Sequence, residues 1–445
     1  MNTAEPRVLA VRALTHIHRE QGYSNIVLDQ LLRDAALSPP DTALVTRLIY
    51  GVVERRLTLD YLIGACSSVP IRKMHPLVAD CLRIGVYQLL YMDRIPAAAA
   101  VNETVRAAKL LGQGHASGFV NGVLRGVQRR HAALLDELPA GDAGDAIRYS
   151  CPEPLIALWR KAYGAELTRG LLDALNQPPP AYVRVNTCQT TDEDMLAALQ
   201  EQGIEATPVA GLPHCLQIHT PALLKTLAKS AKNWYYFQDS ASQWCCMALD
   251  AQPGERVADV CAAPGGKSFT TAQWMQNRGE VTACDVYPAK CDTMAARAEQ
   301  LGLSVVRTVC RDATAPVPSE WAGAFDRVLC DAPCSGFGVI RRKPEIRYKS
   351  FETVAALPEQ QLCMLERAAE LVRAGGVLQY STCTLHPAEN SEVAQRFLAA
   401  HPEFSPRALP LSALPNPLGE PAWYRTLLPP VHNTDGFFLA GFTRA

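Results

Sequence analysis

The sequence lacks the features that assign a chain to a specialised class at once. Its 445 residues carry a formal net charge of only −1, so no overall excess of charge marks the whole chain as a binder of polyanions. It has no run of about 18 apolar residues that could span a bilayer, and residues Met1–Arg7 lack the apolar stretch of a signal peptide. We therefore expect a cytoplasmic protein with no membrane partner.

The 15 cysteines follow neither a disulfide pattern nor a metal-binding pattern. Their number is odd, no Cys-x-x-Cys pair occurs, and no Cys/His cluster has the spacing of a zinc site. The sequence therefore predicts no disulfide framework and no metal. Most cysteines should be reduced, small apolar side chains of the core, and we expect this of Cys284, Cys310 and Cys330.

Charge is unevenly distributed along the chain. Residues 1–131 hold 16 Lys/Arg against 10 Asp/Glu, whereas the remainder holds 27 against 34. A positive amino-terminal third suits a domain that meets a polyanion. A solvated helical surface would give the same count, so charge alone leaves both interpretations open.

Apolar periodicity predicts three parts. Residues 1–137 show helical spacing, for example over 76–92 and 98–111, with short breaks rich in Pro, Ser and Gly, which predicts a compact helical bundle. A loose stretch over 138–150 predicts a domain boundary. Residues 151–245 alternate helices with short strands, as expected of a small α/β linking module.

The third part, residues 246–445, alternates strand and helix. Strands are expected near residues 256–261, 279–284, 304–309, 325–330 and 375–381. Helical crossovers between them force a mostly parallel sheet that is covered on both faces. Segments near 424–428 and 436–440 would add an antiparallel edge pair. The predicted fold class is thus an α/β Rossmann-like domain, preceded by an all-α domain and the linking module.

Three of the predicted strands end in residues suited to binding and chemistry. The first runs into a turn at Gly265 and Gly266, the fourth ends at Asp331 shortly before Cys334, and the fifth ends close to Cys383. Open parallel sheets bind ligands at the carboxyl ends of their strands. We therefore expect these three ends to face one cleft, with a cofactor over the first and the two cysteines acting from the others.

The Gly pair and two further acids predict a nucleoside cofactor. Residues without Cβ let a ligand lie against the backbone at a helix amino terminus, Asp285 is placed to accept ribose hydroxyls, and Asp312 to meet an adenine amino group. A lone acid at such a place is more often a helix cap. Because the GxGxxG and Walker A motifs are absent, S-adenosylmethionine is expected ahead of NAD. The expected contacts are Cys261, Ala262, Ala263, Pro264, Gly265, Gly266, Lys267, Asp285, Asp312 and Asp331.

These motifs resemble those of a known family. Residues 261–267, 331–336 and 380–384, followed by Glu389 and Asn390, are similar in order and spacing to the signature set of the RNA cytosine-C5 methyltransferases. Residues 102–109 and 119–125 resemble the last helices of the NusB RNA-binding domain, so the resemblance extends over nearly the whole chain. It implies transfer of a methyl group from S-adenosylmethionine to C5 of a cytosine in 16S ribosomal RNA, as naked RNA or an early assembly particle, by a monomer.

The chemistry of the base explains why thiols are wanted. C5 of cytosine is a weak nucleophile until a thiolate adds to C6. By resemblance, Cys383 makes this addition, Cys334 assists removal of the C5 proton, Asp331 hydrogen-bonds the base, and Lys267 supports Asp331 or lowers a thiol pKa. The sequence by itself leaves the two thiols interchangeable, because DNA cytosine methyltransferases use the cysteine that follows a proline, here Cys334.

A basic run follows the second motif. Five cations lie within residues 341–349, and we expect Arg341, Arg342 and Lys343 to hold RNA phosphates, although an isolated run of this kind is usually a solvated loop. Two alternative functions are kept: the same chemistry on transfer RNA or another ribosomal RNA site, and a non-catalytic RNA-binding assembly factor. The second is disfavoured because both cysteines, the acids and the Gly pair are present.

Overall fold

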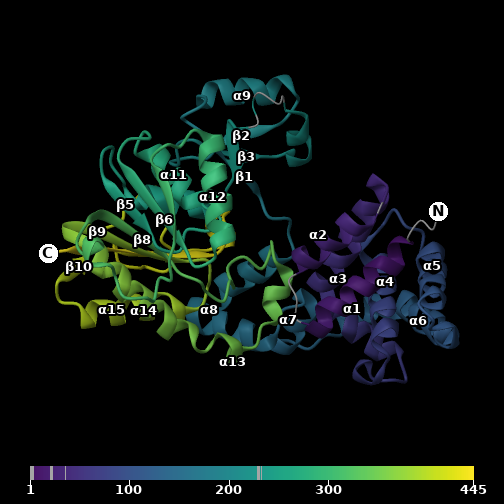
Figure 1. The fold of residues 1–445 in the computed structure, drawn as a ribbon. Coiled ribbons are helices and arrows are strands. Elements are labelled where there is room, and N and C mark those ends of the chain that lie inside the picture. The colour runs from purple at the N-terminus through teal and green to yellow at the C-terminus, as the bar shows by residue number, and fades with distance from the viewer. Residues whose placement is uncertain (1–4, 21–23, 36, 228–230, 232) are drawn as a thin grey trace. The chain divides into compact units, whose positions relative to one another are not determined.

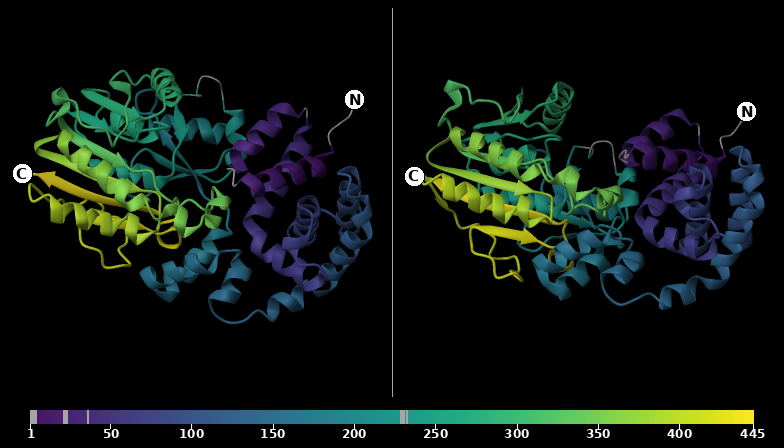
Figure 2. Two further views of the ribbon diagram at one scale, coloured as in Figure 1. Left: turned by 60° about the horizontal axis from the view of Figure 1, so that its bottom comes forward. Right: turned by 90° about the horizontal axis from the view of Figure 1, so that it is seen from below.

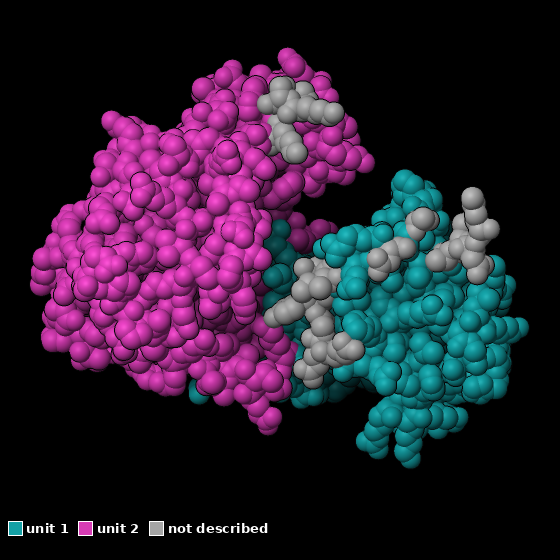
Figure 3. All heavy atoms as spheres, viewed as in Figure 1, with its two compact units in different colours: residues 1–177, 340–348 teal, residues 178–339, 349–445 magenta. Residues whose placement is uncertain are grey.

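The computed structural model describes residues 5–20, 24–35, 37–227, 231 and 233–445. The prediction that the first seven residues are not part of a signal peptide concerns residues 1–4 as well, and these four lie outside the described residues. The chain divides into two compact units, coloured in Figure 3. Unit 1 comprises residues 1–177 and 340–348, and unit 2 comprises 178–339 and 349–445. Within the described ranges, no helix is both long and apolar enough to cross a membrane.

Unit 1 begins with the predicted helical bundle. Its helices are α1 (Pro6–Glu20), α2 (Ser24–Asp34), α3 (Pro39–Cys66), α4 (Pro76–Tyr91), α5 (Ala97–Leu110) and α6 (Ser117–Asp136). The breaks predicted near residues 38–40, 67–70 and 111–114 lie at the start of α3, between α3 and α4, and between α5 and α6. At one such break, the Ser38 side chain accepts a hydrogen bond from the backbone N–H of Asp41 and so caps the amino terminus of α3.

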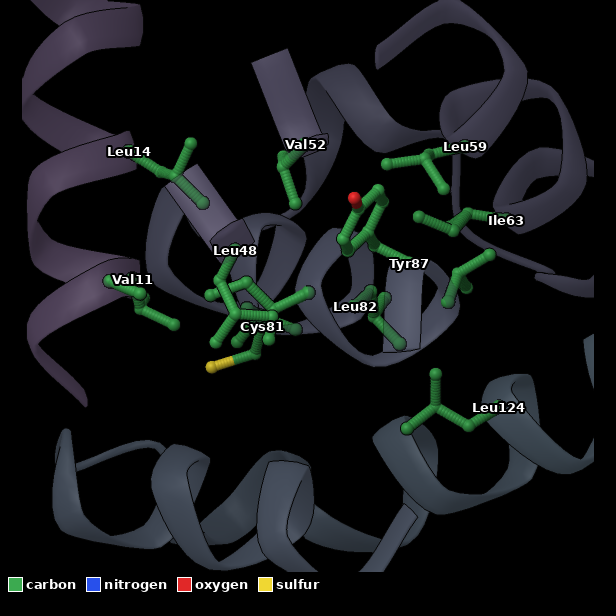
Figure 4. Close-up of a cluster of buried hydrophobic side chains, with 14 of the residues drawn as sticks. Val11, Leu14, Leu48, Val52, Leu59, Ile63, Cys81, Leu82, Tyr87 and Leu124 are labelled. Carbon is green, nitrogen blue, oxygen red and sulfur yellow. The ribbon is translucent and has the colours of Figure 1, made fainter. Parts of the chain in front are cut away.

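The core of the bundle is made of aliphatic side chains at helical spacing. Figure 4 shows side chains from α1, α3, α4 and α6 directed toward one another, with Leu14, Leu48 and Leu124 fully buried. Tyr87 of α4 packs so closely on α3 that a Cβ at Gly51 would lie 2.0 Å from its ring. Each fully buried aliphatic side chain contributes roughly 1.5–3 kcal/mol, which stabilises the bundle.

The stretch expected to be loose is partly helical. Helices α7 (Asp142–Tyr149) and α8 (Glu153–Leu175) also belong to unit 1, and α8 is kinked at Gly164, whose φ is 79°. Helix α7 has only eight residues and few large apolar side chains, so composition alone indicated a loop. The two compact units separate after Gln177.

Unit 2 opens with a small antiparallel sheet in the order β2-β3-β1-β4. Its elements are β1 (Ala181–Val185), α9 (Asp192–Glu201), β2 (Ala206–Pro208), β3 (Cys215–Ile218) and β4 (Tyr235–Phe237). Val183 and Leu216 of the sheet share an apolar core with Met195 and Leu199 of α9. A small sheet packed against a helix is what the alternating pattern predicted.

The larger sheet of unit 2 has the order β10-β12-β9-β8-β5-β6-β7, with β11 paired to β12. Strands β5 to β9 pair with one another in parallel, as predicted, whereas β9 pairs with β12 in antiparallel. The carboxyl-terminal strands are antiparallel, but β12 lies inside the sheet, between β9 and β10, rather than at its edge. The strands are β5 (Arg256–Asp259), β6 (Glu280–Asp285), β7 (Val306–Cys310), β8 (Phe325–Asp331), β9 (Val372–Thr382), β10 (Phe404–Pro406), β11 (Tyr424–Leu427) and β12 (Phe437–Arg444).

Helices cover both faces of this sheet (Figures 1 and 2). Alternate residues of β12 show the division, because Phe437 and Leu439 belong to the core shared with α10–α12, whereas Phe438 and Phe442 belong to the core shared with α14 and α15. The helices are α10 (Ser240–Leu249), α11 (Gly266–Trp274), α12 (Pro288–Leu301), α13 (Phe351–Val354), α14 (Leu357–Leu371), α15 (Ser391–Ala400) and α16 (Pro429–His432).

Residues 340–348 leave unit 2 and pack within unit 1. Arg347 is 1% exposed, and its Nη1 donates hydrogen bonds to the carbonyl oxygens of Glu54 (2.9 Å) and Ser150 (3.1 Å). The Tyr348 hydroxyl donates to the carbonyl of Val53 at 3.0 Å. Arg347, a further cation of the basic run, is therefore buried and bonds to carbonyl groups of its own chain.

We predict that Arg347→Ala lowers the free energy of unfolding of unit 1 by about 2–4 kcal/mol, because it leaves buried carbonyl oxygens without their charged donor. Urea unfolding followed by the helical circular dichroism signal measures this change. Arg342→Ala, at an exposed position of the same segment, is the control, with an expected change within about 0.5 kcal/mol. Equal effects of the two substitutions would contradict the prediction.

Candidate active site

The two candidate cysteines meet at the carboxyl-terminal edge of the parallel strands. Strands β5, β8 and β9 are neighbours in one register, with Asp259 opposite Leu329 and Asp331 opposite Ser381. The loops that follow β8 and β9 bring the sulfur atoms of Cys334 and Cys383 to 3.3 Å from each other. Both side chains are half-buried, so two thiols share one site at the sheet edge.

The pKa of the Cys334 thiol is raised by its surroundings. The hydrogen bond with Cys383 and then burial raise the pKa of Cys334 well above its ordinary value, and the charges of Cys383 and Glu389 act in the same direction. A thiol with a raised pKa keeps its proton. Cys334 is therefore the donor of the sulfur–sulfur hydrogen bond when Cys383 is a thiolate.

Asp331 is held by an ion pair and a hydroxyl. Lys267 Nζ lies 2.7 Å from Asp331 Oδ2, and Ser381 Oγ donates to Asp331 Oδ1 at 2.7 Å. Burial lowers the pKa of Lys267, but the Asp331 carboxylate outweighs burial and raises the pKa above its ordinary value. The ammonium group thus stays charged and fixes the orientation of the carboxylate.

The Gly-rich turn after β5 has little free space. Gly265 has a φ of 104°, and a Cβ there would lie 2.4 Å from the Phe269 ring. Gly266 begins α11, and a Cβ at this position would lie 3.5 Å from Gln238 Nε2. Within the described part of the chain, this buried Nε2 has no hydrogen-bond partner. The turn therefore presents bare backbone and an unpaired amide donor on one side.

Asp259, which precedes the Gly-rich turn, is a buried acid that the sequence motifs did not indicate. Its side chain is 2% exposed, and its Oδ2 accepts a hydrogen bond from Ser268 Oγ at 2.6 Å. Burial raises the pKa of Asp259 to about 7, against an ordinary value of 3.8. Its place at a strand end, equivalent to that of Asp285, was the signal that could have found it.

Two acids are expected to bind the nucleoside, and they lie at the ends of the neighbouring strands β6 and β7. Asp285 closes β6, where its Oδ1 accepts the backbone N–H of Tyr287 at 3.1 Å and lies 3.8 Å from Lys290 Nζ. Asp312 follows β7, and its Oδ1 accepts the N–H and hydroxyl of Thr314, each at 2.8 Å, which lowers the pKa of Asp312. Asp312 thus also has the local bonding typical of a turn acid.

Other expected residues are distributed less simply. Cys284 and Cys330 are buried core thiols as predicted, but Cys310 is exposed, because it closes β7 at the end of the sheet.

In the basic run, Arg342 and Lys343 are exposed and Arg341 is partly exposed. These three belong to unit 1, whereas Cys261–Lys267 and both candidate cysteines belong to unit 2. The groups of three or more side chains that a metal ion would need are not found among the described residues.

Comparison with known proteins agrees with this architecture. The family model described as 16S rRNA methyltransferase RsmB/F matches residues 246–443, the NusB family model matches 4–129, and an RsmF/B-like ferredoxin-like domain matches 151–224. A probable ribosomal RNA small subunit methyltransferase B of Synechocystis sp. is 36% identical over 99% of both chains. The chain belongs to the ribosomal RNA small subunit methyltransferase B family. The family resemblance found in the sequence is thereby confirmed.

Two further similarities extend over the whole chain. A probable ribosomal RNA small subunit methyltransferase B of Bacillus subtilis is 35% identical over 100% of both chains. The crystal structure of PH0851 has the same fold, with a TM-score of 0.79, 24% identity and coverage of 98% of both chains. The order of the matched domains confirms the fold predicted from the sequence: a NusB-like helical domain, a small α/β module and a methyltransferase domain.

The raised pKa of Asp259 predicts how stability depends on pH. Between about pH 4 and pH 7 the folded protein holds a proton on Asp259 that the unfolded chain has lost, so this group lowers the free energy of unfolding as pH rises, by up to about 4 kcal/mol. The melting temperature of Asp259→Asn, relative to wild type, should therefore increase from pH 4.5 to about pH 7.5.

Thermal unfolding of the ligand-free protein across this pH range measures the effect. Asp292→Asn, at an exposed position, controls for the loss of a carboxyl group at the surface. A difference between Asp259→Asn and wild type that stays constant with pH would show that Asp259 titrates normally in the folded protein.

Proposed function

We propose that this protein transfers a methyl group from S-adenosylmethionine to C5 of a cytosine in 16S ribosomal RNA, through a covalent adduct with Cys383. The observation that carries the proposal is the pair of sulfur atoms 3.3 Å apart beside the Lys267–Asp331 ion pair. Two adjacent thiols suit a reaction in which one thiolate adds to the substrate and a second group transfers a proton. The relatives from Synechocystis and Bacillus bear the name of a small-subunit ribosomal RNA methyltransferase, which favours this RNA.

The residues of unit 2 fit the proposed cofactor. Acids at the ends of β6 and β7 suit a ribose and an adenine, and the Gly265–Gly266 turn opens α11, whose amino terminus suits a negatively charged group. The unpaired amide donor of Gln238 beside Gly266 suits the carboxylate of an amino acid moiety. Cys261, Ala262, Ala263 and Pro264 would line the same turn, and Lys267 and Asp331 its inner side. When bound, S-adenosylmethionine supplies an electrophilic methyl group.

The two thiols divide the work on the base. The Cys383 thiolate donates an electron pair to C6, and the π electrons of the C5–C6 double bond move to C5, which then takes the methyl group. Removal of the C5 proton returns its bonding pair to the ring, restores the double bond and expels Cys383 as a thiolate. Cys334 accepts this proton in our assignment.

The raised pKa of Cys334 supports this order of steps. As long as Cys383 is a thiolate, its hydrogen bond and charge hold the proton on Cys334. When the Cys383 sulfur is consumed in the bond to C6, that stabilisation ends and Cys334 can release its proton to solvent, which leaves a base beside C5. One thiol thus adds first and the other becomes competent afterwards.

Asp331 and Lys267 act on the base in this proposal without becoming its covalent partners. A carboxylate can accept about four hydrogen bonds, so Asp331 can receive the amino group of cytosine in addition to Lys267 and Ser381. The charged Lys267 keeps the carboxylate oriented while charge develops on the ring. We further propose that the protein acts as a monomer in the cytoplasm. Nothing in the site favours transfer RNA over ribosomal RNA.

We expect Cys383→Ala to lose both methylation and adduct, because it removes the nucleophile, whereas Cys334→Ala should accumulate a stable protein–RNA adduct, because release is blocked. The measurement is a denaturing gel after incubation with S-adenosylmethionine and unmodified 16S ribosomal RNA, followed by nucleotide mapping. Cys330→Ala, which removes a buried thiol outside the pair, is the control and should retain activity. An adduct in Cys383→Ala instead would exchange the two roles, and modification of transfer RNA alone would overturn the substrate.

We also propose that Arg341, Arg342 and Lys343 bind RNA phosphates. The triple substitution to Ala should weaken RNA binding at low salt and reduce the slope of log K against log salt by about 0.7–0.9 for each phosphate that is no longer neutralised. Filter binding at salt concentrations from about 50 to about 300 mM measures the slope of log K against log salt. Arg396→Ala, which removes an exposed cation paired with Glu359, should leave it unchanged. An unaltered slope in the triple variant would exclude a role for these cations in phosphate binding.

A further inference from the structure

We infer that Glu389 and Asn390 are positioning residues, each of which holds one of the two cysteine loops at the geometry required for reaction. They are consecutive residues at the end of a short 3₁₀ turn, Pro387–Glu389, and the amino terminus of α15. Both are buried, at 1% and 2% exposure, and their side chains bond to residues beside the cysteines. The inference rests on the proposed two-thiol reaction and assigns a role to residues outside it.

Glu389 bonds to both sides of Cys334. Its Oε2 accepts the backbone N–H of Ser335 at 2.8 Å and the side-chain amide of Gln361 at 2.9 Å. The same Gln361 amide nitrogen donates to the carbonyl oxygen of Pro333 at 2.9 Å. The residues directly before and after Cys334 are therefore both tied to one buried carboxyl group, directly or through a fully buried Gln361.

Asn390 bonds to both sides of Cys383 in the same way. Its Oδ1 accepts the Thr382 hydroxyl at 2.6 Å, and its Nδ2 donates to the carbonyl oxygen of Thr384 at 2.9 Å. Thr382 and Thr384 are both 0% exposed. The side chain of Asn390 thus spans the backbone on either side of the proposed nucleophile.

The two halves of this network are joined to each other. The hydroxyl groups of Ser335 and Thr384, the residues that follow the two cysteines, lie 2.6 Å apart and share a hydrogen bond. The Tyr380 hydroxyl donates to the carbonyl oxygen of Glu389 at 2.6 Å, which ties the same turn to β9. Glu389 and Asn390 are consecutive residues. The hydrogen bonds of this dipeptide therefore fix the position of the Cys334 loop relative to the Cys383 loop.

Core stability alone does not account for this arrangement. Four residues flanking two cysteines are all bonded to one dipeptide or its direct partner, and each buried polar atom engaged there would otherwise carry a desolvation cost. Proximity effects in catalysis are steep, because a misplacement of about 1 Å can cost roughly 10²-fold in rate. A buried polar network that over-determines both loops supplies this accuracy.

Two independent readouts test the inference on the full-length protein. The first is the single-turnover rate of methylation with saturating 16S ribosomal RNA and S-adenosylmethionine. The second needs no RNA: diamide oxidises the two thiols to a Cys334–Cys383 disulfide with loss of two protons and two electrons to the reagent, and peptide mass spectrometry follows its formation. Disulfide formation reports the approach of the two sulfur atoms whatever the substrate is.

The variants are chosen to separate positioning from stability. Glu389→Ala and Asn390→Ala remove the bonds, whereas Glu389→Gln keeps an oxygen for Ser335 and Gln361. Thr382→Val removes one hydroxyl and serves if the alanine variants do not fold. The matched control is Asn186→Ala, since Asn186 is also fully buried in unit 2 and donates to two backbone carbonyls, those of Asn233 and Leu301, each at 2.9 Å.

We expect Glu389→Ala and Asn390→Ala to lose about 10²-fold in single-turnover rate and about 10-fold in the rate of disulfide formation, with Thr382→Val intermediate. Glu389→Gln should retain both rates within about 3-fold. Asn186→Ala should do the same, even if its melting temperature falls as much as those of Glu389→Ala and Asn390→Ala. Unchanged disulfide formation in both alanine variants, or an equal loss in Asn186→Ala, would overturn the inference. Wild type that forms the disulfide as expected but does not methylate ribosomal cytosine would instead refute the proposed function and leave the positioning role supported.

Discussion

The parallel pairing of β8 with β9 sets the geometry on which the site depends. It places Asp331 opposite Ser381, so the loops after both strands leave the sheet at the same edge. Cys334 and Cys383, 49 positions apart in the chain, then meet at a sulfur–sulfur distance of 3.3 Å. Strand β5 lies on the other side of β8, and the helix that follows β5 carries Lys267, which bonds to Asp331. A one-residue shift in register would place the Asp331 and Ser381 side chains on opposite faces of the sheet.

Burial at this edge has opposite consequences for neighbouring charges. Lys267 and Asp331 form an ion pair at 2.7 Å, and the carboxylate raises the pKa of Lys267 in spite of its burial. Asp259 receives only a hydroxyl from Ser268, and its pKa rises to about 7. Because stability is lost when an uncompensated acid ionises, the edge of the sheet is maintained at a cost in stability. Functional sites commonly concentrate such perturbed groups.

The basic run after Cys334 illustrates how one segment serves two purposes. Arg347 is buried in unit 1 and bonded to backbone carbonyls, and Lys349 Nζ donates to the carbonyl oxygen of Ser335 in unit 2 at 2.9 Å. Exposed Arg342 and Lys343 precede both in the same run. Charge along a sequence therefore does not distinguish a cation that meets RNA from one that satisfies carbonyl groups of its own chain.

The fold was predictable from the sequence because local signals suffice for it: periodicity defined the helices and strands, and crossover length required the parallel sheet. The motifs at the strand ends indicated the family, and hence the candidate cysteines. Helix α7 escaped detection because it is short and has few large apolar side chains. The position of β12 inside the sheet escaped detection because it depends on pairing between distant segments. Hydrogen bonds such as those of Glu389 and Asn390 with the cysteine loops join residues from separate elements. Their partners follow from packing in three dimensions, which no spacing along the chain encodes.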